Sequence, residues 1–263
     1  MDTDSLFQVD HARKIAAIPT EYDTFEKRNQ FMANTASQWR SLPQLEQSLD
    51  KAWRNELYVV YNPTTKPYML LERAFSVLIG VVTYGVHMNG YVAPCNTSSK
   101  ELKLWIPRRS ATKQTFPNKL DNTVAGGLGH PYGVWETLVK ESLEEAGLEK
   151  QFVEQGAKAA GVVLYMIQPE GTHNQPEVEY IYDLEFPDET SILPFPVDGE
   201  AQDFQLMGFL EVLQRIKAHE FKPNCALVII DFLIRWGYIT PENEPNYLEI
   251  VHKSHRKIPF PTR

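Results

Sequence analysis

Three glutamates on one short segment carry the strongest chemical signal in this sequence. A glycine-rich segment, residues 126–129, precedes Glu141, Glu144 and Glu145 in a stretch whose composition favours a helix. With about 3.6 residues per turn, Glu141 and Glu145 lie one turn apart on one face, and Glu144 lies beside them. A cation relieves the repulsion of such closely spaced charges, and carboxylate oxygens suit Mg²⁺ or Mn²⁺. The three glutamates are therefore predicted metal ligands and catalytic residues of the kind used in diphosphate chemistry.

The opposite face of this helix is expected to anchor it in a hydrophobic core. Val139, Leu143 and Ala146 fall on that face, and Gly147 follows as a helix C-cap. An ordinary helix with a solvated acidic face would explain the glutamates alone. It would not explain the glycine segment that precedes them at this spacing.

The spacing resembles a Nudix box, whose general form is G-x5-E-x7-R-E-U-x-E-E-x-G-U, where U is a bulky aliphatic residue. The matching positions are Gly126, Glu141, Glu144, Glu145, Gly147 and Leu148. Three positions depart from the pattern, with Tyr132 for the first glutamate, Lys140 for the arginine and Ser142 for the aliphatic residue. The resemblance implies a Nudix pyrophosphohydrolase that uses Mg²⁺ or Mn²⁺ to hydrolyse a diphosphate.

Two of the departures change the expected support of the metal site. The arginine of a Nudix box orients the carboxylates, whereas Lys140 keeps the positive charge but lacks the planar fork of a guanidinium. Glu136, four residues before Lys140, is expected to form a substitute ion pair with it. Tyr132 is no carboxylate ligand at neutral pH. A diphosphate-binding module with weakened catalysis is therefore an alternative, which the three intact glutamates disfavour.

Further candidate site residues lie outside the box. Arg108 and Arg109 end a predicted strand, and an arginine binds phosphate oxygens bidentately. Alternation along a strand directs only one of the two into a pocket. Glu200 follows a proline-rich loop and is a candidate general base, as are the box glutamates. Asp203 is expected to cap a following helix or, as a second option, to assist the metal site.

Several residues are candidates for contacting the substrate. Gly126 and Gly127 belong to the glycine segment, and Trp105 can stack on a heteroaromatic ring. His87 lies in a predicted strand and can line the same site, although burial in the core explains His87 and Trp105 as well. Glu177 and Glu179 alternate along another predicted strand and point to one face. They can reach the metals or lie on an exposed face.

A second resemblance extends over most of the chain. It rests on residues 104–110, 116–122, 198–200, 221–227 and 237–245. These segments are similar to fungal and plant Nudix proteins with an extra N-terminal domain, a type also found fused to thiamine pyrophosphokinase. That resemblance implies hydrolysis of thiamine diphosphate and, preferentially, its oxidised forms to monophosphates. Another diphosphate, such as ADP-ribose or a nucleotide sugar, is the nearest alternative. An isomerase of the same superfamily is disfavoured because the surroundings of Cys95 do not match its motif.

Composition and charge favour a protein that acts on a small molecule. The chain has 263 residues and a formal net charge of −8, which argues against general binding to nucleic acids or anionic membranes. With only Cys95 and Cys225, no disulfide framework is expected. No apolar run is long enough to span a membrane and no secretory signal opens the sequence, so a cytoplasmic protein is expected. For the oligomeric state, the superfamily resemblance implies a monomer or a homodimer.

The order of predicted elements indicates an α/β fold, an α/β/α sandwich with a mixed sheet. Helical periodicity is expected over residues 5–55, and residues 75–79 are ambiguous. Strands are predicted over residues 58–61, 68–71, 82–91, 102–107, 161–167 and 178–186, and further helices over 203–220 and 226–236. A division near residue 115 is expected to separate an N-terminal α+β domain, residues 1–114, from a Nudix domain, residues 115–263.

Overall fold

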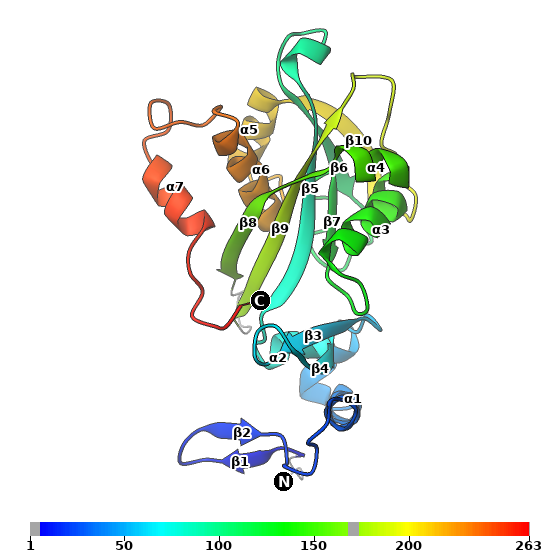
Figure 1. The fold of residues 1–263 in the computed structure, drawn as a ribbon, viewed down its shortest axis with the longest axis vertical. Helices are drawn as coiled ribbons and strands as arrows, with labels where there is room; N and C mark the ends of the chain where they lie inside the picture. Colours follow the sequence, from blue (N-terminus) through cyan, green and yellow to red (C-terminus); the bar gives the residue numbers. More distant parts are fainter. Residues whose placement is uncertain (1–5, 168–173, 263) are drawn as a thin grey trace.

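A mixed six-stranded sheet forms the centre of the fold in the computed structural model, which describes residues 6–167 and 174–262 (Figure 1). Its strands are β5 (Thr83–Val92), β6 (Lys103–Arg109), β7 (Val124–Gly127), β8 (Lys158–Ile167), β9 (Gln175–Phe186) and β10 (Ala201–Gly208). The strand order is β10-β6-β5-β9-β8, and β7 also pairs with β5. The β5–β9 pair is parallel and the other pairs are antiparallel, which confirms the predicted mixed sheet.

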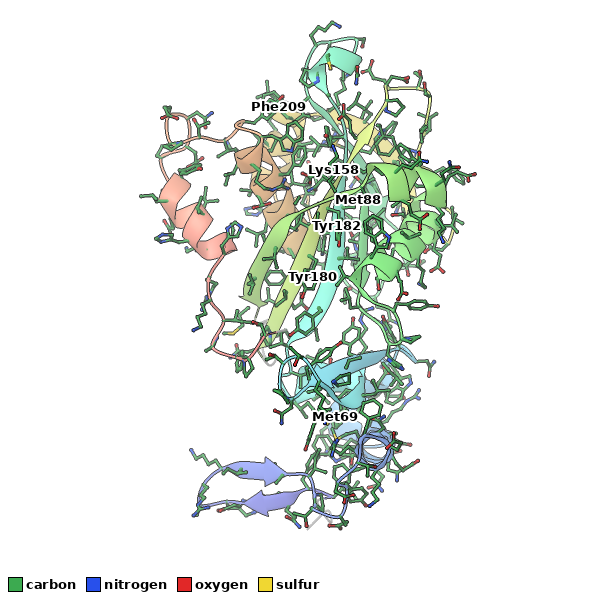
Figure 2. The ribbon with its side chains drawn as sticks, in the orientation of Figure 1. Met69, Met88, Lys158, Tyr180, Tyr182 and Phe209 are labelled. Atoms are coloured by element: carbon green, nitrogen blue, oxygen red, sulfur yellow. The ribbon has the colours of Figure 1, made fainter. Side chains whose placement is uncertain are left out.

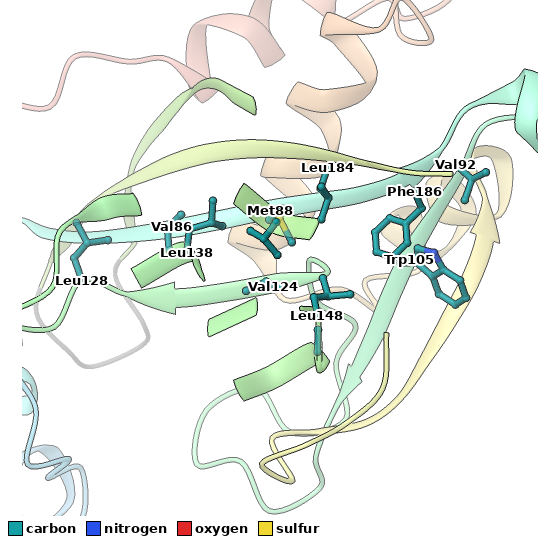
Figure 3. Packing of buried hydrophobic residues seen from close by; sticks show 12 residues of the cluster. Val86, Met88, Val92, Trp105, Val124, Leu128, Leu138, Leu148, Leu184 and Phe186 are labelled. Atoms are coloured by element: carbon teal, nitrogen blue, oxygen red, sulfur yellow. The ribbon is translucent and has the colours of Figure 1, made fainter. Parts of the chain in front are cut away.

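Helices cover both faces of this sheet. One face carries α3 (Val134–Ala146) and α4 (Lys150–Gly156), and the other carries α5 (Phe209–Lys217), α6 (Pro223–Arg235) and α7 (Tyr247–Ser254) (Figure 1). Alternation along β5 produces the two cores. Val86 and Met88 pack under α3 with Leu138 (Figure 3). Tyr91 points to the other face and packs under α6 with Phe232. The predicted three-layered sandwich is confirmed.

A smaller unit precedes the sheet in the chain. Its elements are β1 (Gln8–Asp10), β2 (Ile15–Ala17), α1 (Phe25–Arg40), the 3₁₀ turn Pro43–Leu45, the π turn Glu46–Asp50, β3 (Leu57–Tyr61), β4 (Pro67–Glu72) and α2 (Arg73–Leu78). Phe31 of α1, Met69 and Leu71 of β4 and Phe75 of α2 belong to its own hydrophobic cluster. Figure 2 labels Met69 within this unit. A further 3₁₀ turn, Pro94–Asn96, links β5 to β6. No helix in the described ranges is long and apolar enough to cross a membrane.

The division of the chain lies near residue 82 and not at residue 115 as predicted. Strands β5 and β6 precede residue 115, yet they hydrogen-bond to β7, β9 and β10 within one sheet. The N-terminal hydrophobic cluster ends at Val81, and Tyr84 already packs into the core of the sandwich. Residues 1–114 and 115–263 therefore do not separate two units, because a cut at 115 would remove the central strand of the sheet.

The helix predicted over residues 203–220 is wrong in its first part. Residues up to Gly208 form β10, which pairs with β6, and α5 begins only at Phe209. Asp203 therefore lies opposite Arg108 in the sheet and caps no helix. Pairing with β6 stabilises a strand whose polar sequence has little strand preference of its own.

Candidate active site

The glycine segment and the acidic helix meet at very close range. Gly126 lies in β7 opposite Val86 of β5, and a Cβ atom added at Gly126 would lie 2.5 Å from Cγ of Glu141. Only a glycine lets α3 approach the strand this closely. One turn further along α3, Glu145 Oε2 accepts a hydrogen bond from the backbone N–H of Ala125 (3.0 Å). Two of the three box glutamates are therefore held directly against β7.

The ends of α3 and its buried face explain how the glutamates are oriented. The Glu136 carboxylate accepts a hydrogen bond from the backbone N–H of Gly133 (2.9 Å) at the start of the helix, and Gly147 ends it with left-handed backbone (φ 63°). Leu138 and Ala146 are fully buried, whereas Leu143 is 53% exposed. The prediction that Leu143 anchors the helix is wrong, because the contact with β7 rotates that side chain toward solvent.

Lys140 bridges two of the glutamates. Its Nζ lies 3.0 Å from Glu141 Oε1 and 2.6 Å from Glu144 Oε2. The ion pair predicted with Glu136 is absent from the described contacts, since Glu136 caps the helix instead. Burial alone would lower the pKa of Lys140, but its hydrogen bonds to Glu144 and Glu141 raise that pKa well above its ordinary value. The exposed ring of Tyr132 lies 6.0 Å from the same Nζ.

The donor set of the three glutamates fits a hard divalent cation. Burial raises the pKa of Glu145 to about 8, and the nearby charges of Glu141 and Asp121 add to the effect. Such a carboxyl either takes up a proton or is neutralised by a cation. Among the described residues, no three acidic, histidine or cysteine side chains lie close enough together to hold a metal ion as they stand. The ammonium group of Lys140 lies between Glu141 and Glu144 and forms ion pairs with both. A metal at Glu141, Glu144 and Glu145 would replace that ammonium.

A pocket opens beside Glu145 where β6 and β7 diverge. β6 pairs with β5 only through the last residues of β5, and β7 pairs only with its first half. The charged side chains that line the pocket are Arg109, Lys113, Asp121, Glu145 and Glu200. Pro107, Asn122, Thr123, Ala201 and Phe204 complete the wall. The pocket thus places two cations and three carboxylates around one small space.

Only one of the two adjacent arginines faces this pocket. Arg109 Nη1 donates to Asp121 Oδ2 (2.6 Å), and its other nitrogens donate to backbone carbonyls of Thr115 and Phe116. Arg108 points away, and its Nη1 donates to the carbonyl of Asn118 (2.9 Å). The outcome matches the alternation expected along a strand.

The negative charge of Asp121 is what fixes Arg109. Burial would raise the pKa of Asp121, but Lys222 and Arg109 lower it to about 2. The carboxylate therefore stays ionised and holds the guanidinium at the pocket wall.

Glu200 reaches the pocket from a distant part of the chain. Its carboxylate pairs with Lys113 Nζ, and its backbone carbonyl accepts from Ser110 N (2.8 Å). Both Glu200 and Lys113 line the pocket together with Glu145. The candidate general base Glu200 and the candidate metal ligand Glu145 therefore lie in one pocket.

A second polar group lies on the sheet face under α6 and consists of His87, Glu177 and Glu179. His87 Nδ1 lies 2.7 Å from Asn122 Oδ1, and its Nε2 lies 3.5 Å from Glu179 Oε2. Burial would lower the pKa of His87, but the Glu179 charge raises it well above the ordinary value, so the two form an ion pair. The Tyr165 hydroxyl contacts both Glu177 and Glu179. Glu177 and Glu179 thus lie away from the box glutamates.

The remaining predicted residues have packing neighbours. Trp105 is 7% exposed, its ring lies 6.0 Å from that of Phe186, and its indole nitrogen has no hydrogen-bond partner in the described residues. It belongs to the core under α3 and not to the pocket wall. Gly127 lies under the hydroxyl of Tyr58 from the N-terminal unit.

Sequence reasoning did not single out Lys113, Asp121, Tyr165 or Tyr58 as site residues. Asp121 lies within residues 116–122, a segment on which the second resemblance rests. The sequence therefore pointed to this segment, but not to Asp121 itself. The others are brought in by strand pairing and domain contact, for which no local sequence pattern exists.

Three relatives share extensive sequence with this chain, whereas no family model matches it. An uncharacterised protein of the yeast Saccharomyces cerevisiae, YJR142W, is 47% identical over 97% of this chain and 75% of its own length. Nudix hydrolase 24 and Nudix hydrolase 20 of Arabidopsis thaliana, both named as chloroplastic, are each 42% identical over 76% of this chain. The chain spans about half the length of these two plant proteins, 53% and 52%. The cytosolic location stays a prediction.

We expect Glu145→Gln to stabilise the metal-free protein at pH 8 and to have little effect at pH 5. The carboxyl has a pKa of about 8 when folded against a model value of 4.5, so the stability it contributes is lost as the pH rises through this window. An amide does not ionise. Thermal unfolding in a chelating buffer measures the difference, and about 1 kcal/mol corresponds to roughly 2–4 °C in Tm.

Glu154→Gln, at an exposed position of α4, is the matched control and should not change this pH dependence. Mg²⁺ should then stabilise the wild type more than Glu145→Gln. Equal Tm shifts for Glu145→Gln at both pH values would contradict a carboxyl whose pKa is raised by burial.

Proposed function

Because this chain belongs to the Nudix hydrolase superfamily, we propose that it hydrolyses thiamine diphosphate and its oxidised forms to monophosphates. One observation carries the proposal for diphosphate hydrolysis. Glu145 of the box, the cation Arg109 and the distant carboxylate Glu200 line one pocket. That arrangement unites a metal ligand, a phosphate-binding group and a proton acceptor.

Segments outside the box support the choice of substrate class. Residues 116–122 contribute Asp121 to the pocket and Asn122 to its wall, and residues 221–227 contribute Asn224, which donates to the Tyr165 hydroxyl (2.9 Å). These are segments on which the resemblance to the thiamine-related Nudix proteins rests. Their side chains surround the pocket and the adjoining polar group, where an organic part of the substrate would be recognised.

The reaction is attack of water on the terminal phosphorus of the diphosphate. The new P–O bond forms from water, the bridging P–O bond breaks, and the products are the monophosphate and inorganic phosphate. Glu200 accepts the proton of the attacking water, with a box glutamate as the alternative acceptor. Arg109, held by Asp121, binds phosphoryl oxygens as charge develops on them.

Glu141, Glu144 and Glu145 are the residues that would hold Mg²⁺ or Mn²⁺. When bound, such a cation neutralises phosphoryl oxygens and lowers the pKa of water. Glu145 keeps its position through the backbone N–H of Ala125, and Glu141 keeps its position through the contact with Gly126.

A direct comparison of substrates tests the proposed function. The wild-type protein with Mg²⁺ or Mn²⁺ is assayed for product release from thiamine diphosphate, its oxidised analogues, ADP-ribose and UDP-glucose. We expect kcat/KM for the thiamine diphosphates to exceed that for the other two by at least about tenfold, or about 1.4 kcal/mol. A preference for ADP-ribose or UDP-glucose would assign another Nudix substrate, and turnover of none would indicate a binding module.

The adjacent arginines provide a matched pair for the phosphate-binding role. Arg109→Lys keeps the charge but loses the bidentate fork, and kcat/KM is expected to fall by about 10–100-fold. Arg108→Lys, on the same strand but turned away from the pocket, should change kcat/KM by less than about twofold. Tm is measured for both variants. Equal effects of the two substitutions on kcat/KM would contradict the role of Arg109.

A further inference from the structure

The N-terminal unit is joined directly to the glycine segment of the candidate active site. The backbone N–H of His130 donates to the carbonyl of Leu57 in β3 (2.7 Å), and Tyr58 forms an isolated β-bridge with Gly129. β3 therefore adjoins the loop between β7 and α3, as the ribbon also shows (Figure 1). The two segments approach closely here, since a Cβ added at Gly129 would lie 2.7 Å from Oε1 of Glu56.

This contact carries the Tyr58 side chain onto β7. Tyr58 is 8% exposed, and a Cβ atom added at Gly127 would overlap its hydroxyl oxygen. None of the hydrogen bonds found between the described residues uses that hydroxyl. Burial raises the pKa of Tyr58 well above its usual range, so the phenol keeps its proton at neutral pH. The hydroxyl thus lies against β7 as a protonated hydrogen-bond donor.

A buried carboxylate oxygen that lacks a hydrogen-bond donor lies on the same face of the sheet. Gly127 pairs with Gly85 of β5, and a Cβ atom added at Gly85 would overlap Glu179 Oε2. This oxygen is buried and has no hydrogen-bond partner in the described part of the chain, the nearest cation being His87 Nε2 at 3.5 Å. Two glycines on paired strands therefore leave room for a phenol hydroxyl from the N-terminal unit and an unpartnered carboxylate oxygen from the sheet.

The pocket and this pair of groups are connected along one face of the sheet. Asn122 lines the pocket and contacts His87, which in turn contacts Glu179. His87 and Gly85 are two residues apart on β5, or about 7 Å along the strand. The contacts from Asn122 through His87 thus lead from the pocket wall to Glu179.

We propose that Tyr58 and Glu179 bind an amino-substituted nitrogen heterocycle in the organic part of the substrate, so that the N-terminal unit determines specificity. An amino group next to a ring nitrogen offers a donor and an acceptor side by side. Glu179 accepts from the amino group, and the Tyr58 hydroxyl donates to the ring nitrogen. Buried groups that are left unpaired by the wrong substrate discriminate strongly against it. The inference rests on the proposed function.

Tyr58→Phe tests the role of the hydroxyl alone. With thiamine diphosphate and Mg²⁺, KM should rise about tenfold while kcat changes by less than about twofold, because one substrate hydrogen bond is lost. Inhibition by methylenediphosphonate, a diphosphate mimic without a heterocycle, should keep its inhibition constant. Tyr68→Phe is the matched control, since Tyr68 lies in β4 of the same unit with Arg28 stacked 4.0 Å over its ring.

A second variant reaches the same hydroxyl from the sheet. Gly127→Ala displaces Tyr58 and should produce the same selective rise in KM, whereas Gly133→Ala meets only an ordinary contact at 3.7 Å and should not. An unchanged KM for Tyr58→Phe, or a loss confined to kcat, would overturn the inference while leaving diphosphate hydrolysis intact. Absence of turnover in the wild type would overturn the proposed function, and this inference with it.

Discussion

The close approach of α3 to β7 at Gly126 is the constraint on which the rest of the site depends. Because no side chain separates them, Glu141 packs on the strand itself and Glu145 reaches the backbone N–H of Ala125. The helix is thereby fixed in rotation, with Leu138 buried and Leu143 exposed. The same strand has no side chain at Gly127, so its other face is open to Tyr58 from the N-terminal unit. Two consecutive glycines allow a close contact on each face.

The divergence of β6 and β7 supplies the second requirement. A continuous sheet would leave no space beside Glu145, but here β5 changes partner along its length, from β7 to β6. The gap is lined by charged groups that are held by one another, as Arg109 is by Asp121 and Glu200 is by Lys113. Such mutual pairing keeps buried charges ionised and oriented before a substrate arrives. The chemistry proposed for the chain depends on this preorganisation.

The sequence predicted features that depend on local spacing and failed where long-range pairing decides. Spacing alone identified the box helix and its glutamates, and alternation indicated that only one of Arg108 and Arg109 would face a pocket. The strand β10 was mistaken for helix because its pairing with β6 is set by residues almost a hundred positions away. The division at residue 115 failed for the same reason, since the partners of β5 lie on both sides of it. Tyr58 and Asp121 gain their positions only through tertiary contacts.

The affinity of the protein for Mn²⁺, measured by electron paramagnetic resonance, tests most directly whether the contact at Gly126 positions the glutamates. The compared proteins are the wild type, Gly126→Ala and Gly133→Ala. Alanine at 126 would push Glu141 away from β7, so we expect Mn²⁺ to bind at least about tenfold more weakly, a change of about 1.4 kcal/mol. Alanine at 133 has room for its methyl group and should bind Mn²⁺ like the wild type. Unchanged Mn²⁺ affinity in a folded Gly126→Ala protein would contradict the proposal that this contact positions Glu141 and Glu145 for binding a metal.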